Sequence, residues 1–159
     1  MVKPVPDGYH SVTPYIIVDD AAAAIDFYAK AFGATEVLRL PMGDKIGHAE
    51  LKIGDSHVML ADEFPDRNIR GPKARGGPTA SLLVYVDDVD TTFRRALDAG
   101  GKIDGGMDVK DQFYGDRSGT LIDPFGHKWT VATHIEDVSP QEMQARMQAL
   151  SAAEENQPA

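Results

Sequence analysis

The sequence predicts an α+β fold of two βαβββ modules that pack together, followed by a C-terminal helix. A β-rich run, an Asp-Asp pair and an amphipathic stretch occur twice, at an offset of about 68 residues. A strand, a glycine turn, a His and a second strand occupy residues 53–60, and the same pattern returns around residues 120–133. Because one such module leaves a face of its sheet bare, two packed copies bury a joint surface.

Composition limits the possible functions. The chain has 159 residues, which predicts one domain over residues 1–159. Its formal net charge of −9 disfavours nucleic acid and anionic membranes as partners, since both need a basic face. The absence of cysteine excludes disulfides and thiolate metal sites. No apolar leader or membrane-length stretch is visible, so we expect a cytoplasmic protein.

The first module is predicted over residues 9–62. Residues 12–18 form a β-rich run, and Asp19 and Asp20 follow it as candidate helix caps. Apolar residues then recur at helical spacing up to Gly33, a residue type typical of the position just beyond a helix. Three short strands are predicted next, over residues 35–40, 47–53 and 56–61.

A connector over residues 63–79 separates this module from the second, predicted over residues 80–134. The connector is rich in Pro and Gly and long for a compact domain, so it forms either a lid or a mobile bridge. In the second module a strand over residues 80–86 leads to Asp87 and Asp88, which take the capping positions. Short strands are predicted around Ile103 and Val109, and then over residues 119–122 and 127–133.

The C-terminal helix is predicted over residues 139–150. Ser139-Pro140-Gln141-Glu142 has the pattern of a capping box with proline at the first helical position. Met143, Met147 and Leu150 form a narrow apolar stripe, which we expect to dock on the body or on a second subunit. Residues 151–159 are expected to fray.

Five segments together resemble the vicinal oxygen chelate superfamily, which contains glyoxalases, bleomycin-resistance proteins and dioxygenases. The resemblance covers residues 9–147, and it is most similar to the PhnB-like branch. It implies paired modules whose sheets curl into an open cup, and it implies a homodimer. The scaffold supports many chemistries, so the resemblance alone does not select one. The segments are residues 24–34, residues 47–51, residues 84–90, residues 115–117 and residues 123–129.

Glyoxalase I-type members hold a divalent metal in the cup through His and Glu side chains. Matching this sequence to that pattern places Thr13, Leu60, Ser81 and Thr130 at the four ligand positions, with Asp62 two residues beyond Leu60. None of the four is a normal ligand for a catalytic divalent ion. We therefore predict no metal at this site and no cofactor.

Strand alternation predicts which side chains face the cup. His48 and Glu50 share one face of a strand at i and i+2, so they are the candidate acid–base pair. Alternatively, the two side chains lie at the solvated rim of the cup and have no chemical role. The full set predicted to contact a ligand is Thr13, Tyr15, His48, Glu50, Leu60, Asp62, Ser81, Leu83, Tyr85, Tyr114, Arg117 and Thr130.

Two residues of that set lie on a loop and have two interpretations each. Arg117 either closes its loop by an ion pair with Asp116 or binds an anionic ligand group. Tyr114 on the same loop either lines the cup or shields its edge. Trp129 is predicted in the core, and His127 is interpreted as a turn or second-layer residue.

Two functions remain open at this point. In one, the cup binds a small organic molecule without chemistry, as expected for an apolar cup lined by tyrosine and leucine. In the other, the protein is an enzyme of the same superfamily that uses His48 and Glu50, with or without an unusual divalent metal. The expected partners are a small organic ligand and a second copy of the chain.

Overall fold

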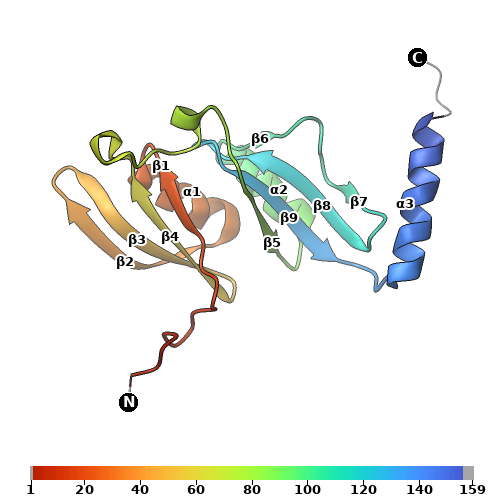
Figure 1. Cartoon of the computed structure of the whole chain (residues 1–159), viewed down its shortest axis with the longest axis horizontal. Coiled ribbons are helices and arrows are strands. Elements are labelled where there is room, and N and C mark those ends of the chain that lie inside the picture. The colour runs from red at the N-terminus through yellow and green to blue at the C-terminus, as the bar shows by residue number, and fades with distance from the viewer. Residues whose placement is uncertain (1, 156–159) are drawn as a thin grey trace.

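The computed structural model describes residues 2–155, which form two sheets backed by helices (Figure 1). The first module contains β1 (Tyr15–Val18), α1 (Ala21–Phe32), β2 (Thr35–Met42), β3 (Lys45–Ile53) and β4 (Ser56–Asp62). The second contains β5 (Ser81–Tyr85), α2 (Val89–Asp98), β6 (Lys102–Ile103), β7 (Lys110–Asp111), β8 (Asp116–Ile122) and β9 (Lys128–His134). Two short turns, η1 (Pro65–Arg67) and η2 (Lys73–Arg75), lie between the modules, and α3 (Pro140–Glu155) ends the described chain.

The helices begin where the sequence predicts them. The carboxylate of Asp20 accepts the Ala23 amide proton at 2.9 Å, and that of Asp88 accepts the Thr91 amide proton at 3.0 Å. Gly33 ends α1 in the left-handed conformation, with φ 68°. These contacts satisfy amide groups that the first helical turn leaves without partners. The caps therefore fix where each module changes from strand to helix.

The two sheets repeat one topology. Module one has the strand order β1-β4-β3-β2, and module two has β5-β9-β8-β6, with β7 also paired to β8. The first strand of each module runs parallel to the last, as Tyr15 pairs with Met59 and Ser81 with Lys128. In Figure 1 the edge strands β1 and β5 face each other at the centre of the molecule. This repeat confirms the predicted two-module fold.

The core lies between the sheets and their helices. Trp129, Tyr28 and Phe32 pack together there, with the Trp129 ring centroid 4.8 Å from that of Phe32. The buried Asp123 carboxylate accepts the Tyr28 hydroxyl proton at 2.6 Å and the Trp129 indole proton at 3.0 Å. Because Tyr28 belongs to module one and Asp123 to module two, this network joins the modules. Trp129 thus occupies the predicted core position.

We call the opposite surface of the two sheets, turned away from α1 and α2, the cup face. In the strand register, Glu50 stands opposite both Leu38 and Met59, and Met59 stands opposite Tyr15. Since directly paired residues point to one side, these four share the cup face. It is covered by no helix of the described chain (Figure 1).

The connector packs against the junction of the modules. The Gly71 amide donates to the Glu63 carboxylate at 2.6 Å, and Lys73 pairs with Asp19 at 2.7 Å. A side chain at Gly71 would stand 2.8 Å from the Ile17 carbonyl, so only glycine permits this close approach. The last two contacts hold the connector against the end of β1 and the turn that follows it.

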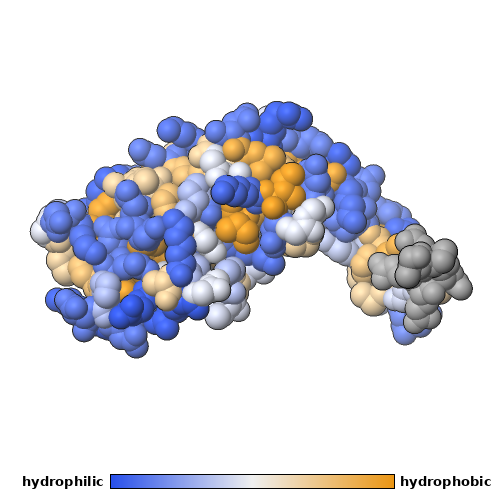
Figure 2. Space-filling model, turned by 90° about the horizontal axis from the view of Figure 1, so that it is seen from above, coloured by the Kyte–Doolittle hydropathy of each residue, from blue (hydrophilic) through white to orange (hydrophobic). Residues whose placement is uncertain are grey.

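Helix α3 projects from the end of module two, and Figure 2 shows open space between it and the body. It is capped as predicted, since the Glu142 amide donates to the Ser139 hydroxyl at 3.2 Å. It continues to Glu155, beyond the predicted end at residue 150, while the predicted frayed residues 156–159 lie outside the described chain. No helix in residues 2–155 is long and apolar enough to cross a membrane.

Candidate functional site

The cup face of module one carries a linked group of polar side chains, which we call cluster one: Tyr9, Tyr15, His48 and Glu50. His48 lies between two partners, with Nδ1 2.9 Å from the Tyr15 hydroxyl and Nε2 3.0 Å from Glu50 Oε1. Glu50 Oε2 also accepts the Tyr9 hydroxyl proton. The structure therefore brings together the pair that the i, i+2 spacing predicts, and adds two phenols to it.

The proton positions in cluster one follow from its chemistry. An ionised carboxylate can only accept, so Nε2 of His48 donates to Glu50. In a neutral imidazole Nδ1 is then an acceptor, and the Tyr15 hydroxyl donates to it. Hydrogen bonds from His48 and from Tyr9 lower the pKa of Glu50 below its usual value of 4.5. The arrangement gives a continuous hydrogen-bonded path from Tyr15 through His48 to Glu50.

Sequence reasoning missed Tyr9 and did not assign a partner to His57. Both lie at the base of cluster one, with their rings stacked at a centroid distance of 3.9 Å. His57 Nδ1 also lies 2.9 Å from the Gly8 carbonyl, which ties the N-terminal arm to β4. Glu50 raises the pKa of Tyr9, chiefly through their hydrogen bond. Because the arm and β4 are far apart in sequence, no local pattern indicates this contact.

Module two carries a second polar group on its cup face, which we call cluster two: Tyr85, Asp116, His134 and Asp137. The buried Asp116 carboxylate accepts the Tyr85 hydroxyl proton at 2.8 Å, and its other oxygen lies 2.8 Å from His134 Nδ1. His134 Nε2 lies 3.0 Å from Asp137. Hydrogen bonds to these two carboxylates raise the pKa of His134 above 6.5. Only Tyr85 among these residues was a predicted site residue.

The other predicted site residues on the strands of module two face the cup, as strand alternation predicts. Ser81, Leu83 and Tyr85 are the exposed positions of β5, and Leu83 pairs with Thr130. The Thr130 hydroxyl lies 2.9 Å from that of Thr120 on β8. Tyr114 reaches the Ser118 hydroxyl at 3.4 Å, so it lies at the edge of this face.

The prediction that Leu60 and Asp62 face the cup is wrong. Leu60 is completely buried in the core, and Asp62 accepts the Ala21 and Ile46 amide protons at 2.7 and 2.6 Å. Met59 and Ala61 take the cup-side positions instead. Residues 56–62 include apolar side chains on both faces of the strand, so no polar alternation fixed the register.

The predicted ion pair between Asp116 and Arg117 does not form, and Arg117 does not reach the cup. Its guanidinium binds Asp90 at 2.8 Å and Asp111 at 2.9 Å on the side of the sheet where α2 lies. Neighbouring residues on a strand point to opposite faces, so the side chains of Asp116 and Arg117 lie on opposite sides of the sheet.

Two further predicted residues make contacts with backbone carbonyls. Thr13 precedes β1 and donates to the His10 carbonyl at 3.3 Å. His127 links the two modules, because its Nε2 lies 2.8 Å from the Ile17 carbonyl in module one.

A family model matches this chain over residues 8–131, under the description Glyoxalase/Bleomycin resistance protein/Dioxygenase superfamily. The chain belongs to this superfamily. An uncharacterized protein of Mycobacterium tuberculosis H37Rv, Rv0887c, is 42% identical over 141 residues, which cover 86% of this chain and 82% of that protein.

Two solved structures share the fold of this chain. TioX from Micromonospora sp. ML1 is similar with a TM-score of 0.60 and 26% identity, over 82% of this chain and all of that one (100%). A Bacillus cereus PhnB protein, described as a putative 3-demethylubiquinone-9 3-methyltransferase, has a TM-score of 0.61 and 20% identity. That match covers 78% of this chain and 99% of the PhnB chain, and at this identity it shows the fold alone.

The superfamily's metal chemistry does not fit the residues at the matched positions. Thr13, Ser81 and Thr130 offer hydroxyls, and the cup-side residue beside Leu60 is Met59 with a thioether. Neither group is a strong ligand for a catalytic divalent ion. Within residues 2–155 no three His, Asp or Glu side chains converge in a way that could hold a metal.

Two cavities border the cup face in this superfamily member. One of about 560 Å³ lies between the facing edges of the sheets and is lined by His57, Leu83 and Tyr85 among others. A second of about 390 Å³ lies beneath the connector and includes Tyr15 and Lys128. Both are within the size range of small-molecule sites. Each is lined by side chains of both modules, so a ligand there would touch the two halves of the repeat.

Proposed function

We propose that the protein binds a small organic molecule on the cup face between its two modules, without a metal. The observation that carries this proposal is the exposure of large apolar side chains beside the polar clusters. Tyr15 and Leu83 are each 50% exposed and Tyr85 is 61% exposed, although they stand on adjacent edge strands at the centre of the molecule. Convergent apolar surface with a few fixed polar groups is typical of ligand sites.

A dye experiment tests this proposal. Phenylnaphthylamine is neutral, apolar and fluorescent only when it leaves water, so its titration reports an apolar site. We expect the parent chain to bind it, and Leu83→Asp to bind about tenfold more weakly or worse because a carboxylate would replace apolar contact area. Ile103→Asp is the matched control, since Ile103 is 39% exposed and pairs with the core residue Leu121 on the opposite face of the same sheet. Equal binding by both variants would contradict the proposal.

A second candidate function is an enzyme that uses His48 and Glu50. The observation that favours it is the continuous Tyr15–His48–Glu50 chain, because it connects a half-exposed phenol to a base. Native mass spectrometry of gently purified protein would identify a retained small molecule. Conversion of that molecule by excess protein, lost in Glu50→Gln, would establish the enzyme; recovery of the molecule unchanged would establish simple binding.

We further propose a homodimer in which a second copy closes the cup. Leu38 and Leu40 pair with Glu50 and His48 on the cup face and remain 38% and 49% exposed. Light scattering should therefore give twice the chain mass of 17.2 kDa at micromolar concentration. Leu40→Asp should shift the mass toward the monomer, whereas Ile103→Asp should not. A monomer mass for the parent chain would contradict this assembly.

Two finer assignments belong to the same proposal. Membership in the PhnB-like branch is supported by the motifs around residues 24–34 and 123–129 and by the fold shared with the Bacillus cereus PhnB protein. A cytoplasmic location agrees with the lack of cysteine.

A further inference from the structure

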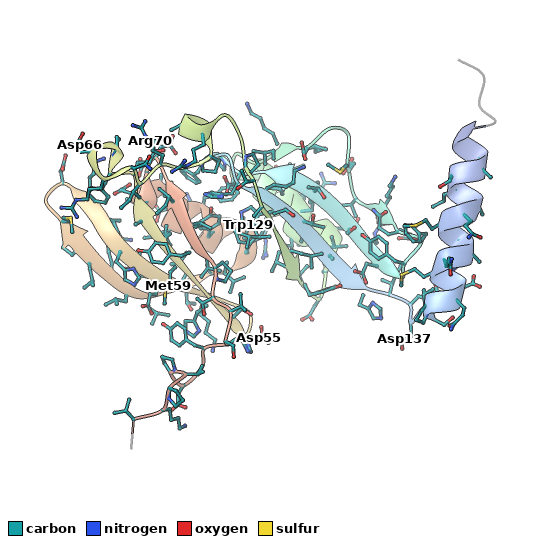
Figure 3. All side chains as sticks on the ribbon, in the orientation of Figure 1. Asp55, Met59, Asp66, Arg70, Trp129 and Asp137 are labelled. Carbon is teal, nitrogen blue, oxygen red and sulfur yellow. The ribbon has the colours of Figure 1, made fainter. Side chains whose placement is uncertain are left out.

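The connector places two arginines at the mouth of the cavity that it covers. Arg70 and Arg75 both line the 390 Å³ cavity, together with Tyr15, Lys128 and His127. Both also line a neighbouring cavity of about 370 Å³ that shares Tyr15. Figure 3 shows Arg70 where the connector passes above the strands of module one. Both arginines therefore share two cavities with Tyr15, a member of cluster one.

These arginines differ from the two lysines nearby, which are both neutralised by a carboxylate. Lys73 pairs with Asp19 at 2.7 Å, and Lys128 pairs with Asp104 at 2.6 Å. Within residues 2–155 Arg70 and Arg75 take part in no ion pair. The carboxylate closest in sequence to Arg70 on its amino-terminal side is Asp66, which forms no ion pair either, and Glu63 is held by the Gly71 amide. Two cationic side chains without carboxylate partners therefore line the same cavity.

The connector also holds Arg75 in place through neutral groups. Its Nε donates to the Arg70 carbonyl at 3.3 Å, and its Nη2 donates to the Asn68 carbonyl at 3.2 Å. Carbonyls orient a guanidinium without cancelling its charge. Arg75 retains further N–H donors, and a guanidinium suits a planar or tetrahedral oxyanion.

We propose that Arg70 and Arg75 form an anion subsite of the cup, so that its ligand is a small apolar molecule carrying one oxyanion group. A carboxylate, sulfonate or phosphate has the required chemistry. The apolar part would lie along Tyr15, Ile17 and Leu82, which line the same cavity, while the oxyanion points to the connector. This inference rests on the proposed function and specifies its ligand class.

A pair of dyes that differ by one charged group tests the inference. Anilinonaphthalenesulfonate has the same aromatic framework as phenylnaphthylamine plus a sulfonate. We expect Arg70→Gln/Arg75→Gln to weaken sulfonate-dye binding about threefold to tenfold, as two exposed charge contacts allow. The neutral dye should bind this double variant and the parent chain equally. Added salt should weaken only the sulfonate dye.

The control is Arg94→Gln, which removes the same charge from the exposed surface of α2. It should leave both affinities unchanged. Equal weakening of both dyes in the double variant would overturn the inference, because the arginines would then support the cavity rather than the anion. Unchanged sulfonate binding would overturn it as well. If neither dye binds the parent chain, the proposed function fails, and this inference fails with it.

Discussion

The cup faces of the two modules hold a carboxylate in different ways, although the strands that build them are arranged alike. Glu50 is half-buried and accepts protons from an imidazole and a phenol. Asp116 is buried and accepts from a phenol, while its His134 partner also contacts Asp137. A histidine between a phenol and a carboxylate can pass a proton along. A histidine between two carboxylates instead has its pKa raised, which favours the cationic form.

This difference assigns separate roles to the two halves of the repeat. Cluster one ends at Tyr15, which is half-exposed at the centre of the cup, so it can meet a ligand. Cluster two ties β5, β8 and β9 to the start of the segment that leads to α3. We infer that module one supplies the responsive groups and that module two supplies a fixed wall.

The largest expected effect is the difference in stability cost between a substitution in the core and one on the cup face. Trp129→Ala should lower the free energy of unfolding by about 3–5 kcal/mol, because Trp129 is 2% exposed and packs on Phe32. His48→Ala, on the cup face, should cost about 1 kcal/mol or less. Urea denaturation of both variants measures this. The reverse order would mean that the facing assignment is one residue out of register.

A smaller difference is expected between the two carboxylates. Asp116→Asn should lower the free energy of unfolding by about 1–3 kcal/mol, because it weakens hydrogen bonds to a buried group. Glu50→Gln should cost less than about 1 kcal/mol, since water can reach the half-buried site. Urea titrations at neutral pH compare the two variants directly. Equal costs would show that cluster two is no more fixed than cluster one.

The pH dependence should distinguish the two histidine environments. Because the pKa of His134 is raised above 6.5 in the folded chain, its imidazolium stabilises the fold. That contribution is fully present below the unfolded value of 6.5 and is lost as the pH rises through the folded pKa. The stability difference between the parent chain and His134→Gln should therefore shrink from pH 5.5 to pH 8.5, about one unit or more either side of that value. A difference that grows with pH would contradict this assignment.

The smallest expected effect concerns the pKa of Glu50. In His48→Ala the carboxylate loses its main hydrogen-bond donor, so the pKa of Glu50 should rise toward its usual 4.5. Tyr15→Phe is the control, because Tyr15 contacts His48 and not Glu50 by a hydrogen bond. A carbon-detected nuclear magnetic resonance titration of the Glu50 carboxyl measures both variants. An unchanged pKa in His48→Ala would remove the support for a direct His48–Glu50 bond.

The elements were predictable because their signals are local. Asp20, Gly33 and Asp88 mark helix ends by side-chain and backbone chemistry that depends only on near neighbours. The His48–Glu50 pair was predictable for the same reason, since i and i+2 on a strand share a face. The alternation rule did not predict which side chains of β4 face the cup, because both faces of that strand carry apolar residues.

The rest of the candidate site depends on contacts between distant segments. Tyr9 reaches Glu50 only because the N-terminal arm folds beside β4. Asp116 and His134 meet only because β8 and β9 pair with Asp116 opposite His134. No spacing in the sequence encodes these encounters, so both clusters were incomplete until the register was known.

The central claim is that the two cup faces form one ligand site, and an amide correlation spectrum tests it most directly. Phenylnaphthylamine titrated into labelled protein should shift the amide signals of Tyr15 and His48 in module one and of Leu83 and Thr130 in module two. All four should follow one binding curve with a single Kd. Shifts confined to one sheet, or two curves with different Kd values, would contradict the claim.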